Sequence, residues 1–196
     1  MSGKPQFDEA AVIAAAMAVF RRHGYAAASI ADLTEATGLS RSSLYQRFGD
    51  KDGLFQEALA EYTQRVLRRM NAAQADTARS RLDALLRGFL PDASAPPRPA
   101  GCLIARSCAE LVDLSAAGQG AALAAAARQR EILANLLREG QAKGELRHDA
   151  DVDALAWHFL GILQAILNFP NAGADAGLLD RVIDVAMSAW PAHPRT

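Results

Sequence analysis

The sequence predicts an all-α fold of about nine helices, in which a three-helix N-terminal domain precedes a larger helical bundle. Hydrophobic residues make up 51% of the 196 residues, which is enough for a core, and charged residues make up 22%. Alanine is abundant and aromatic residues are sparse, which favours helix because alanine loses no side-chain entropy there. Apolar residues also recur at helical spacing, and no strand-like alternation or internal repeat occurs.

The first two helices have clear sequence boundaries. An apolar stripe at helical spacing runs from Phe7 to Phe20 and stops at Gly24. Ser29, three residues before Asp32, resembles a capping box at the start of a short second helix. Gly38 is expected to end this helix, because glycine adopts the left-handed conformation at a helix C-terminus without steric cost.

The remaining helices are placed by caps, glycines and apolar periodicity. Ser40 caps a third short helix that ends at Gly49, and Asp50 opens a long fourth one. Further helices are expected near residues 80–90, 101–115, 119–143, 151–169 and 175–190. Four prolines within residues 91–99 predict a loop, and the tail after Trp190 is expected to fray.

Three short helices followed by a long one are typical of a helix-turn-helix domain. Gly38 supplies the turn, and the apolar side chains of the third helix point into a small core. The polar side chains left outside are hydroxyls, an amide and guanidiniums, which are donors suited to phosphates and base edges. The predicted DNA-binding residues are Ser29, Ser40, Arg41, Ser42, Ser43, Tyr45, Gln46, Arg47 and Lys51.

Position along the helices divides these residues by role. The start of a recognition helix contacts base edges, which selects Arg41, Ser42 and Gln46. The residues expected to flank them and bind phosphates are Tyr45, Arg47 and Lys51. Backbone N–H groups near Ser29 can bind another phosphate. A merely solvated helix face is the alternative, but the full spacing from Ser29 to Lys51 favours DNA binding.

Charge alone does not indicate a nucleic-acid partner. The net charge is −1 and the pI is about 6.4. The segment from Met1 to Asp52 carries six basic and six acidic side chains, so 6 − 6 leaves no net charge. DNA affinity must therefore rest on where a few side chains point, and weak non-specific affinity is expected.

Residues Leu33–Phe55 resemble the DNA-binding signature of TetR-type repressors, most specifically in the spacing Leu44-Tyr45-x-x-Phe48-x-x-Lys51-x-x-Leu54. The resemblance implies that Tyr45 and Lys51 contact phosphates and that residues 40–43 contact the operator. Many members have alanine where this chain has Thr34, which is small enough to fit.

The resemblance also implies the domain plan and the partners. Residues 1–52 would form the helix-turn-helix domain, and residues 53–196 a helical domain for effector binding and dimerisation. The implied function is that of a dimeric regulator, most often a repressor. It would bind a palindromic double-stranded DNA operator and be released by a small-molecule inducer.

The last two predicted helices are apolar on more than one face, whereas a surface helix needs only one apolar stripe. This favours a four-helix homodimer interface with a pair of helices from each subunit, and a thick monomeric core is the alternative. The predicted interface residues are Leu155, Phe159, Ile162, Ile166, Leu179, Val182, Ile183, Ala186 and Trp190.

Inducer pockets in helical bundles are mostly apolar with few polar groups. The candidate ligand-binding residues are Cys102, Arg106, Cys108, Trp157 and His158. Each has a structural alternative, since a buried cysteine often fills space and a tryptophan often belongs to the core. Arg106 lies among apolar residues and needs an anion, for which Glu110 is a candidate one turn later.

The sequence gives no sign of an enzyme. It has no HExxH, GxSxG, GxGxxG or GxxxxGK motif, its histidines are scattered, and its cysteines lack zinc-ligand spacing. No cofactor and no metal are expected. Two other functions stay open: a redox-responsive regulator acting through Cys102 or Cys108, and a helical interaction module without operator binding.

The expected location is the cytoplasm. Lys4, Asp8 and Glu9 interrupt any signal-peptide pattern, and no uninterrupted apolar run approaches the ~18 residues that cross a bilayer. Cys102 and Cys108 would project about 120° apart on a helix, which does not suit a disulfide. They are therefore expected to be cytosolic thiols, and no membrane partner is expected.

Overall fold

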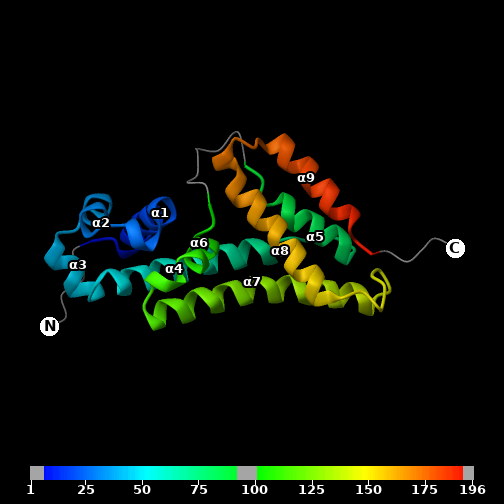
Figure 1. Cartoon of the computed structure of the whole chain (residues 1–196), viewed down its shortest axis with the longest axis horizontal. Helices are drawn as coiled ribbons and strands as arrows, with labels where there is room; N and C mark the ends of the chain where they lie inside the picture. The colour runs from blue at the N-terminus through cyan, green and yellow to red at the C-terminus, as the bar shows by residue number, and fades with distance from the viewer. Residues whose placement is uncertain (1–6, 92–100, 192–196) are drawn as a thin grey trace. The chain divides into compact units, whose positions relative to one another are not determined.

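The computed structural model describes residues 7–91 and 101–191, and this part of the chain is entirely helical, with no strand. The α-helices are α1 (Glu9–Ala27), α2 (Ile30–Thr37), α3 (Arg41–Phe48), α4 (Lys51–Asn71), α5 (Ala78–Arg87), α6 (Leu103–Ala109), α7 (Ala116–Ala142), α8 (Val152–Asn168) and α9 (Ala176–Ser188). Two 3-10 segments are η1 (Leu111–Asp113) and η2 (Phe169–Ala172) (Figure 1). The all-α prediction is confirmed. The loop predicted at 91–99 and the predicted fraying after Trp190 fall outside the described residues, except for Pro91 and Pro191.

The chain divides into two compact units. Unit 1 comprises residues 1–65 and 102–126, and unit 2 comprises residues 66–101 and 127–196. Unit 1 thus contains α1, α2, α3, most of α4, α6, η1 and the start of α7. Unit 2 contains the end of α4, α5, the rest of α7, α8, η2 and α9. The functional boundary expected at residue 52 stays a prediction.

The helix ends of unit 1 follow the predicted local signals. The backbone of α1 leaves helical geometry at Gly24 (φ 82°, ψ 178°), where the sequence predicted the end of the helix. Ser29 and Asp32 form the predicted capping box: the Ser29 N–H donates to Asp32 Oδ2 at 2.9 Å, and the Asp32 N–H donates to Ser29 Oγ at 3.1 Å. Gly38 ends α2 in the left-handed conformation (φ 70°).

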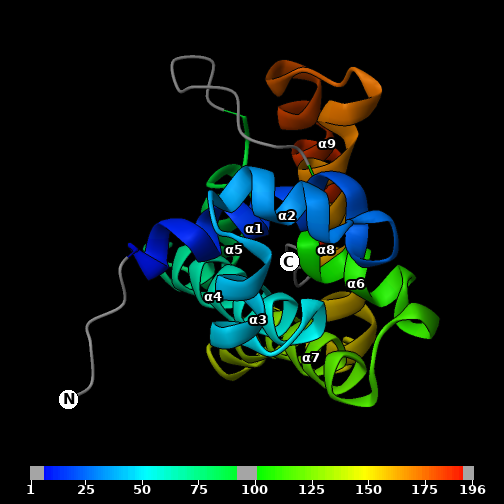
Figure 2. The ribbon, with the colours of Figure 1, turned by 90° about the vertical axis from the view of Figure 1, so that its left-hand side faces the viewer.

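The core of unit 1 is built from aromatic and leucine side chains. The Phe20 and Phe55 rings meet edge to face with centroids 5.2 Å apart, and Tyr25 packs on Phe55 at 4.9 Å. The Leu33 side chain of α2 and the Leu44 side chain of α3 are also buried. α2 packs against both α1 and α3, as the end-on view shows (Figure 2). Through Phe55, α1 therefore packs on the beginning of α4.

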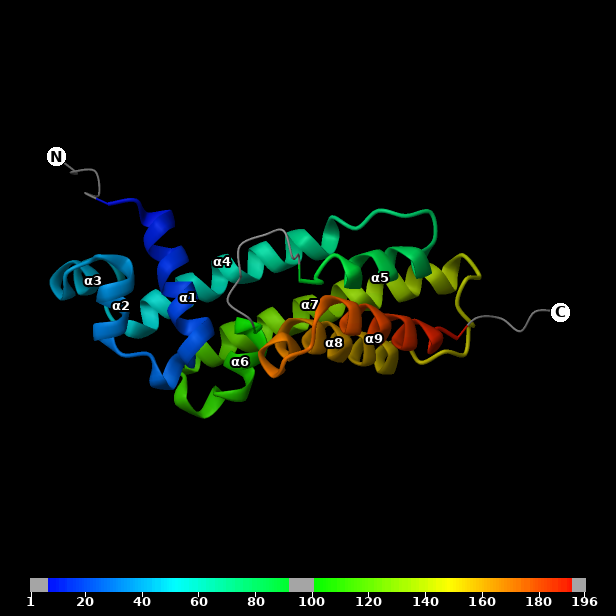
Figure 3. The ribbon, with the colours of Figure 1, turned by 90° about the horizontal axis from the view of Figure 1, so that it is seen from above.

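The core of unit 2 lies between α5, α8, α9 and the second half of α7 (Figure 3). Its buried side chains include Leu82, Leu85, Leu86, Leu133, Leu137, Phe159, Leu163, Leu179 and Ile183. At its surface, Arg87 of α5 forms ion pairs with Asp83 (2.9 Å), with Asp180 and with Asp184 (2.6 Å). The last two carboxylates belong to α9, so Arg87 fixes α9 on α5.

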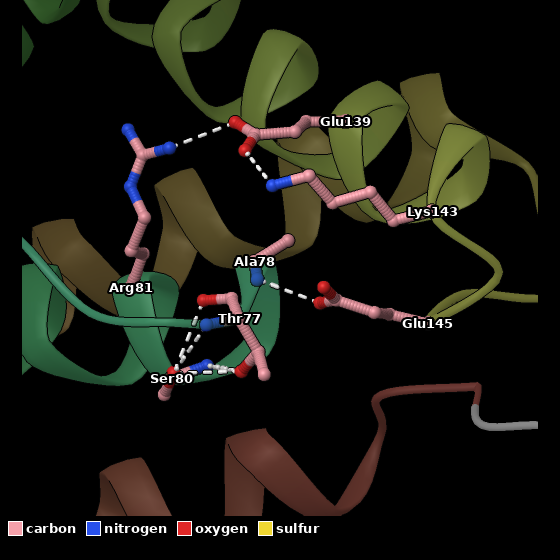
Figure 4. A network of polar contacts seen from close by, with 7 residues as sticks. All are labelled: Thr77, Ala78, Ser80, Arg81, Glu139, Lys143 and Glu145. Atoms are coloured by element: carbon pink, nitrogen blue, oxygen red, sulfur yellow. Dashed lines mark hydrogen bonds and ion pairs between the residues drawn. The ribbon is translucent and has the colours of Figure 1, made fainter.

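The start of α5 is held by a polar network (Figure 4). Thr77 and Ser80 form a capping box, so α5 begins earlier than the predicted residue 80. Glu145 accepts the Ala78 N–H at 2.6 Å, and Arg81 pairs with Glu139 of α7 at 2.7 Å. Glu145 thus satisfies a free N–H group in the first turn of α5. The Arg81–Glu139 pair joins α5 to α7.

The helix predicted over residues 101–115 is wrong in length. It is divided into α6, which ends at Ala109, and η1, which begins at Leu111. Glu110 lies between them with φ −106° and ψ 22°, and its carboxylate accepts backbone N–H groups of Tyr25 and Ala26. This long-range contact has no counterpart in local propensity, so the interruption was not visible in the sequence.

Within residues 7–91 and 101–191, one helical stretch, Val152–Ala172, is long and apolar enough by composition to cross a membrane. It qualifies without an uninterrupted apolar run because Asp153 is its only charged residue. Its Phe159, Leu163 and Ile166 side chains are buried in unit 2. The same described residues contain no group of three or more His, Cys, Asp or Glu side chains placed to hold a metal ion.

Candidate nucleic-acid interface

α3 presents one apolar and one polar face. Leu44 and Phe48 are buried, and Leu39 just before the helix is buried with them. This packing leaves exposed the residues Ser40, Arg41, Ser42, Tyr45, Gln46 and Arg47, while Ser43 is half-buried. The buried leucine and phenylalanine thus orient α3 so that the predicted DNA-binding side chains share its outer surface.

The serines at the start of α3 cap the helix. Ser40 Oγ accepts the Ser43 N–H at 3.1 Å and lies 2.9 Å from both Ser42 Oγ and Ser43 Oγ. Such a cap satisfies one free N–H group of the first turn. Arg41 is exposed and takes part in no ion pair within the described residues. It is therefore the guanidinium of α3 that is available to an anion.

Arg47 has a different environment. Its guanidinium forms ion pairs with Glu9 of α1 and, at 2.9 Å, with Glu57 of α4, and it lies 4.7 Å from the Phe48 ring centroid. These carboxylates, Glu9 first, raise the pKa of Arg47 above its usual value. Arg47 therefore connects α3 to its two neighbours, and its charge is compensated. Its predicted phosphate contact requires that these pairs rearrange.

Lys51 is also engaged. Its Nζ donates to the Tyr25 carbonyl at 2.9 Å and to the Ala28 carbonyl at 3.1 Å, and it lies 4.3 Å from the Tyr25 ring centroid. These contacts hold the segment between α1 and α2 on the start of α4. The predicted phosphate contact of Lys51 stays a prediction, now for an ammonium that is half-buried in its own domain.

At the start of α2, the Ser29 hydroxyl donates to Asp32 Oδ2 at 2.7 Å. This bond and the bond from the Ser29 N–H hold the pKa of Asp32 below its usual value. A carboxylate with a lowered pKa stabilises the fold above its unfolded pKa, and this contribution is lost as the pH falls through the folded pKa. The capping box is therefore intact at neutral pH and uses the N–H groups of Ser29 and Asp32, while the phosphate contact expected near Ser29 stays a prediction.

Arg106 of α6 has a structural partner at each end of its guanidinium. Its Nε donates to Glu110 Oε1 at 3.1 Å, and its Nη2 donates to the His23 carbonyl of α1 at 2.8 Å. Glu110 Oε2 in turn accepts the Tyr25 N–H at 2.6 Å. The sequence prediction that Glu110 pairs with Arg106 is confirmed. The pair also binds the end of α1, where Gly24 leaves room for it.

The five predicted ligand-binding residues belong to two different units. Cys102 (buried), Arg106 and Cys108 (half-buried) lie in unit 1, and Trp157 and His158, both exposed, lie in unit 2. Cys108 Sγ is 3.8 Å from the Ala122 carbonyl, and the Arg130 guanidinium lies 5.7 Å from the Trp157 ring centroid. His158 packs edge to face on Phe159 at 5.0 Å.

Most of the predicted dimer residues are buried within their own chain. Those buried are Phe159, Ile166, Leu179, Ile183, Ala186 and Trp190, and those half-buried are Leu155, Ile162 and Val182. The exposed large apolar side chains of α8 and α9 are instead Trp157 (57% exposed), Leu178 and Val185 (72%). The sequence identified the correct two helices as doubly apolar but did not indicate which face the chain itself covers.

Sequence reasoning missed the residues that position α3. Glu9 and Glu57, the partners of Arg47, are 38 and 10 residues away from it in the chain. Tyr25, whose carbonyl accepts a hydrogen bond from Lys51 Nζ, is 26 residues away from Lys51. No local pattern indicates such pairs.

Family models match most of the chain. A model described as "Bacterial regulatory proteins, tetR family" matches residues 12–58, and one described as "Tetracyclin repressor-like, C-terminal domain" matches residues 78–186. The two matches together cover the helix-turn-helix and the helices from α5 to α9.

Individual proteins resemble the chain over nearly its whole length. The HTH-type transcriptional repressor ComR of Escherichia coli K12 is 32% identical over 193 residues, which are 96% of this chain and 92% of that protein. A cysteine-substituted form of the TetR family transcriptional regulator CifR, solved with 26-bp double-strand operator DNA, is 32% identical. It covers 96% of this chain and 100% of its own, with a TM-score of 0.82. A TetR transcriptional regulator from Chloroflexus aurantiacus is 26% identical over 90% of both chains, with a TM-score of 0.78.

Proposed function

Because the chain belongs to the TetR family of bacterial transcriptional regulators, we propose that it is a homodimeric repressor that binds a palindromic operator through α3. A small molecule that binds the C-terminal helices releases it. The chain acts in the cytoplasm, without catalytic activity and without a cofactor. The division of labour at residue 52, with operator binding before it and effector binding and dimerisation after it, is part of this proposal.

The observation that carries DNA binding is the outer face of α3. It has hydroxyl, amide, phenol and guanidinium groups, and α3 contains no acidic residue. Arg41 and Gln46 can each form two hydrogen bonds to a base, with guanine and adenine as the preferred partners. In this proposal, Tyr45 and the N-terminus of α2 bind phosphates on either side. The related regulator CifR was solved with operator DNA, which supports operator binding by this chain.

The direct test is binding of the purified chain to DNA upstream of its own gene. We expect a discrete complex in a gel shift that survives excess unrelated DNA, with two chains per site. The expected salt dependence is shallow, because residues 1–52 carry as many acidic as basic side chains. No complex with any upstream fragment would refute the proposal and would favour a helical interaction module without an operator.

For the dimer, we propose that the exposed apolar face of α8 and α9 packs against the same face of a second chain. Trp157 and Gly161 share one side of α8, and Leu178, Val182 and Val185 share one side of α9. A Cβ added at Gly161 would meet nothing within 4 Å, so a partner helix can approach closely there. Two such helix pairs, related by a twofold axis, make a four-helix interface.

Replacing Val185 by glutamate is expected to dissociate the dimer. A twofold interface contains the substitution twice, and an unpaired carboxylate buried against apolar side chains costs several kcal/mol. The dimer dissociation constant should rise by about 100-fold or more. Sedimentation velocity over a dilution series measures it. Val112→Glu is the control, because Val112 is 92% exposed and lies in unit 1. An equal response of both variants would contradict the proposed face.

The redox alternative is less well supported by the thiols. Burial raises the pKa of the Cys108 thiol, which disfavours its reactive thiolate, and Cys102 is buried, which limits the access of an oxidant to it. We therefore expect operator affinity to change less than about twofold after peroxide treatment. Anisotropy titrations with and without peroxide test this, with the Cys102→Ser, Cys108→Ser double variant as control. A peroxide effect that the double variant abolishes would favour a redox-responsive regulator that acts through these cysteines.

A further inference from the structure

Gln129 of α7 is a buried polar side chain without a partner. Its side chain is 0% exposed, and neither its Oε1 nor its Nε2 has a hydrogen-bond partner in residues 7–91 and 101–191. One turn away on the same side of the helix lie Ala125 and Leu133, both buried. The amide is therefore directed into an apolar interior, where it makes no hydrogen bond.

The other buried polar residues of the described chain behave differently. Thr63 donates to the Leu59 carbonyl at 2.7 Å, and Ser107 donates to the Leu103 carbonyl at 2.7 Å. Both hydroxyls thus bond within their own helix, which is the ordinary way to bury them. Gln129 is the exception, and an unsatisfied buried amide is destabilising. A residue that costs stability in the free protein is typical of a functional site.

A second amide in the same unit supports this view. Gln164 of α8 is half-buried, and its Oε1 atom is buried without a partner among the described residues. Both α7 beyond residue 126 and α8 belong to unit 2. Among its described residues, the unit therefore has two buried amide oxygens without a partner, which need N–H or O–H donors, and one buried amide N–H₂ group without a partner, which needs an acceptor.

We propose that Gln129 is the polar anchor of the effector site and that it selects a neutral compound with both a donor and an acceptor, such as a carboxamide. This inference rests on the proposed function, since it specifies the chemistry of the releasing ligand. The ligand is expected to be neutral, because the Gln129 amide provides no charge to compensate an ion that loses its hydration on binding. Of the two arginines that flank Gln129 in the chain, Arg128 is exposed, and Arg130 already faces Asp153 at 3.8 Å and the Trp157 ring.

The first test is the stability of the ligand-free chain. Gln129→Leu keeps the size and the helix propensity while it removes the unsatisfied groups. We expect the Tm of the full chain to rise by about 3 °C. Arg128→Leu, an exposed neighbour on α7, should not raise it. A lower Tm for Gln129→Leu would overturn the proposal, because it would mean that the amide is already satisfied by a structural water.

The second test is ligand chemistry. Butanamide, hexanamide and benzamide at millimolar concentration should raise the Tm of the parent chain by about 2 °C, whereas butanoate, hexanoate and benzoate should not. The Gln129→Leu variant should lose this response. Carboxylates that stabilise as much as amides, or amides that stabilise neither protein, would overturn the proposal. Amides that stabilise the parent chain but leave it on the operator would support the site and refute ligand-controlled release.

Discussion

Replacing Gly24 by alanine is expected to lower the free energy of unfolding by about 3 kcal/mol. The backbone there has φ 82° and ψ 178°, a region that is essentially restricted to glycine and costs other residues ~1–3 kcal/mol. An added Cβ would also overlap Glu110 Oε1 and lie 2.6 Å from Arg106 Nε. The ion pair would have to move, and the hydrogen bond from the Tyr25 N–H to Glu110, worth ~1.5–3 kcal/mol, would be lost.

Urea unfolding followed by circular dichroism at one fixed protein concentration measures this loss. Gly38→Ala is the matched control: Gly38 also has a positive φ of 70°, but nothing lies within 4 Å of its added Cβ. We expect that control to cost only about 1 kcal/mol. If both variants lose the same stability, the contact between the end of α1 and the Arg106–Glu110 pair has no energetic weight.

Replacing Arg41 by alanine is expected to weaken operator binding by about 100-fold or more. A hydrogen-bonded contact of an arginine to a base contributes ~1–3 kcal/mol, and a dimer on a palindrome loses it in both half-sites. Arg41 is exposed at the start of α3 and forms no ion pair in the described chain, so its loss should leave the fold intact. Fluorescence anisotropy on the upstream fragment at fixed salt gives the dissociation constants.

Arg128→Ala is the control for charge, since Arg128 is an exposed arginine on α7. It should change affinity less than about threefold. Lys51→Ala gives a useful contrast, because Lys51 holds the Tyr25 and Ala28 carbonyls and its loss should reduce both stability and binding. Equal effects of Arg41→Ala and Arg128→Ala would mean that the outer face of α3 is not the DNA-binding surface.

Helix ends and caps, which depend on near neighbours in the chain, could be predicted from the sequence alone. The break at Gly24, the Ser29–Asp32 capping box and the left-handed Gly38 are confirmed because caps and helix ends are set within a few residues. The buried face of α3, with Leu44 and Phe48, follows from helical periodicity for the same reason.

Which side chains have partners within the chain, and which helix faces are covered, depends on the tertiary packing. The sequence assigns both Arg41 and Arg47 to DNA contacts, yet Arg47 is paired with Glu9 and Glu57 from other helices, while Arg41 takes part in no ion pair within the described residues. Periodicity showed that α8 is apolar on two faces, but packing against α5 and α9 decided which one the chain covers and left Trp157 exposed. Gln129 is likewise an ordinary helical glutamine until the surrounding helices bury it. In each case the deciding contact joins residues far apart in the chain, and helix propensity and periodicity carry no information about such contacts.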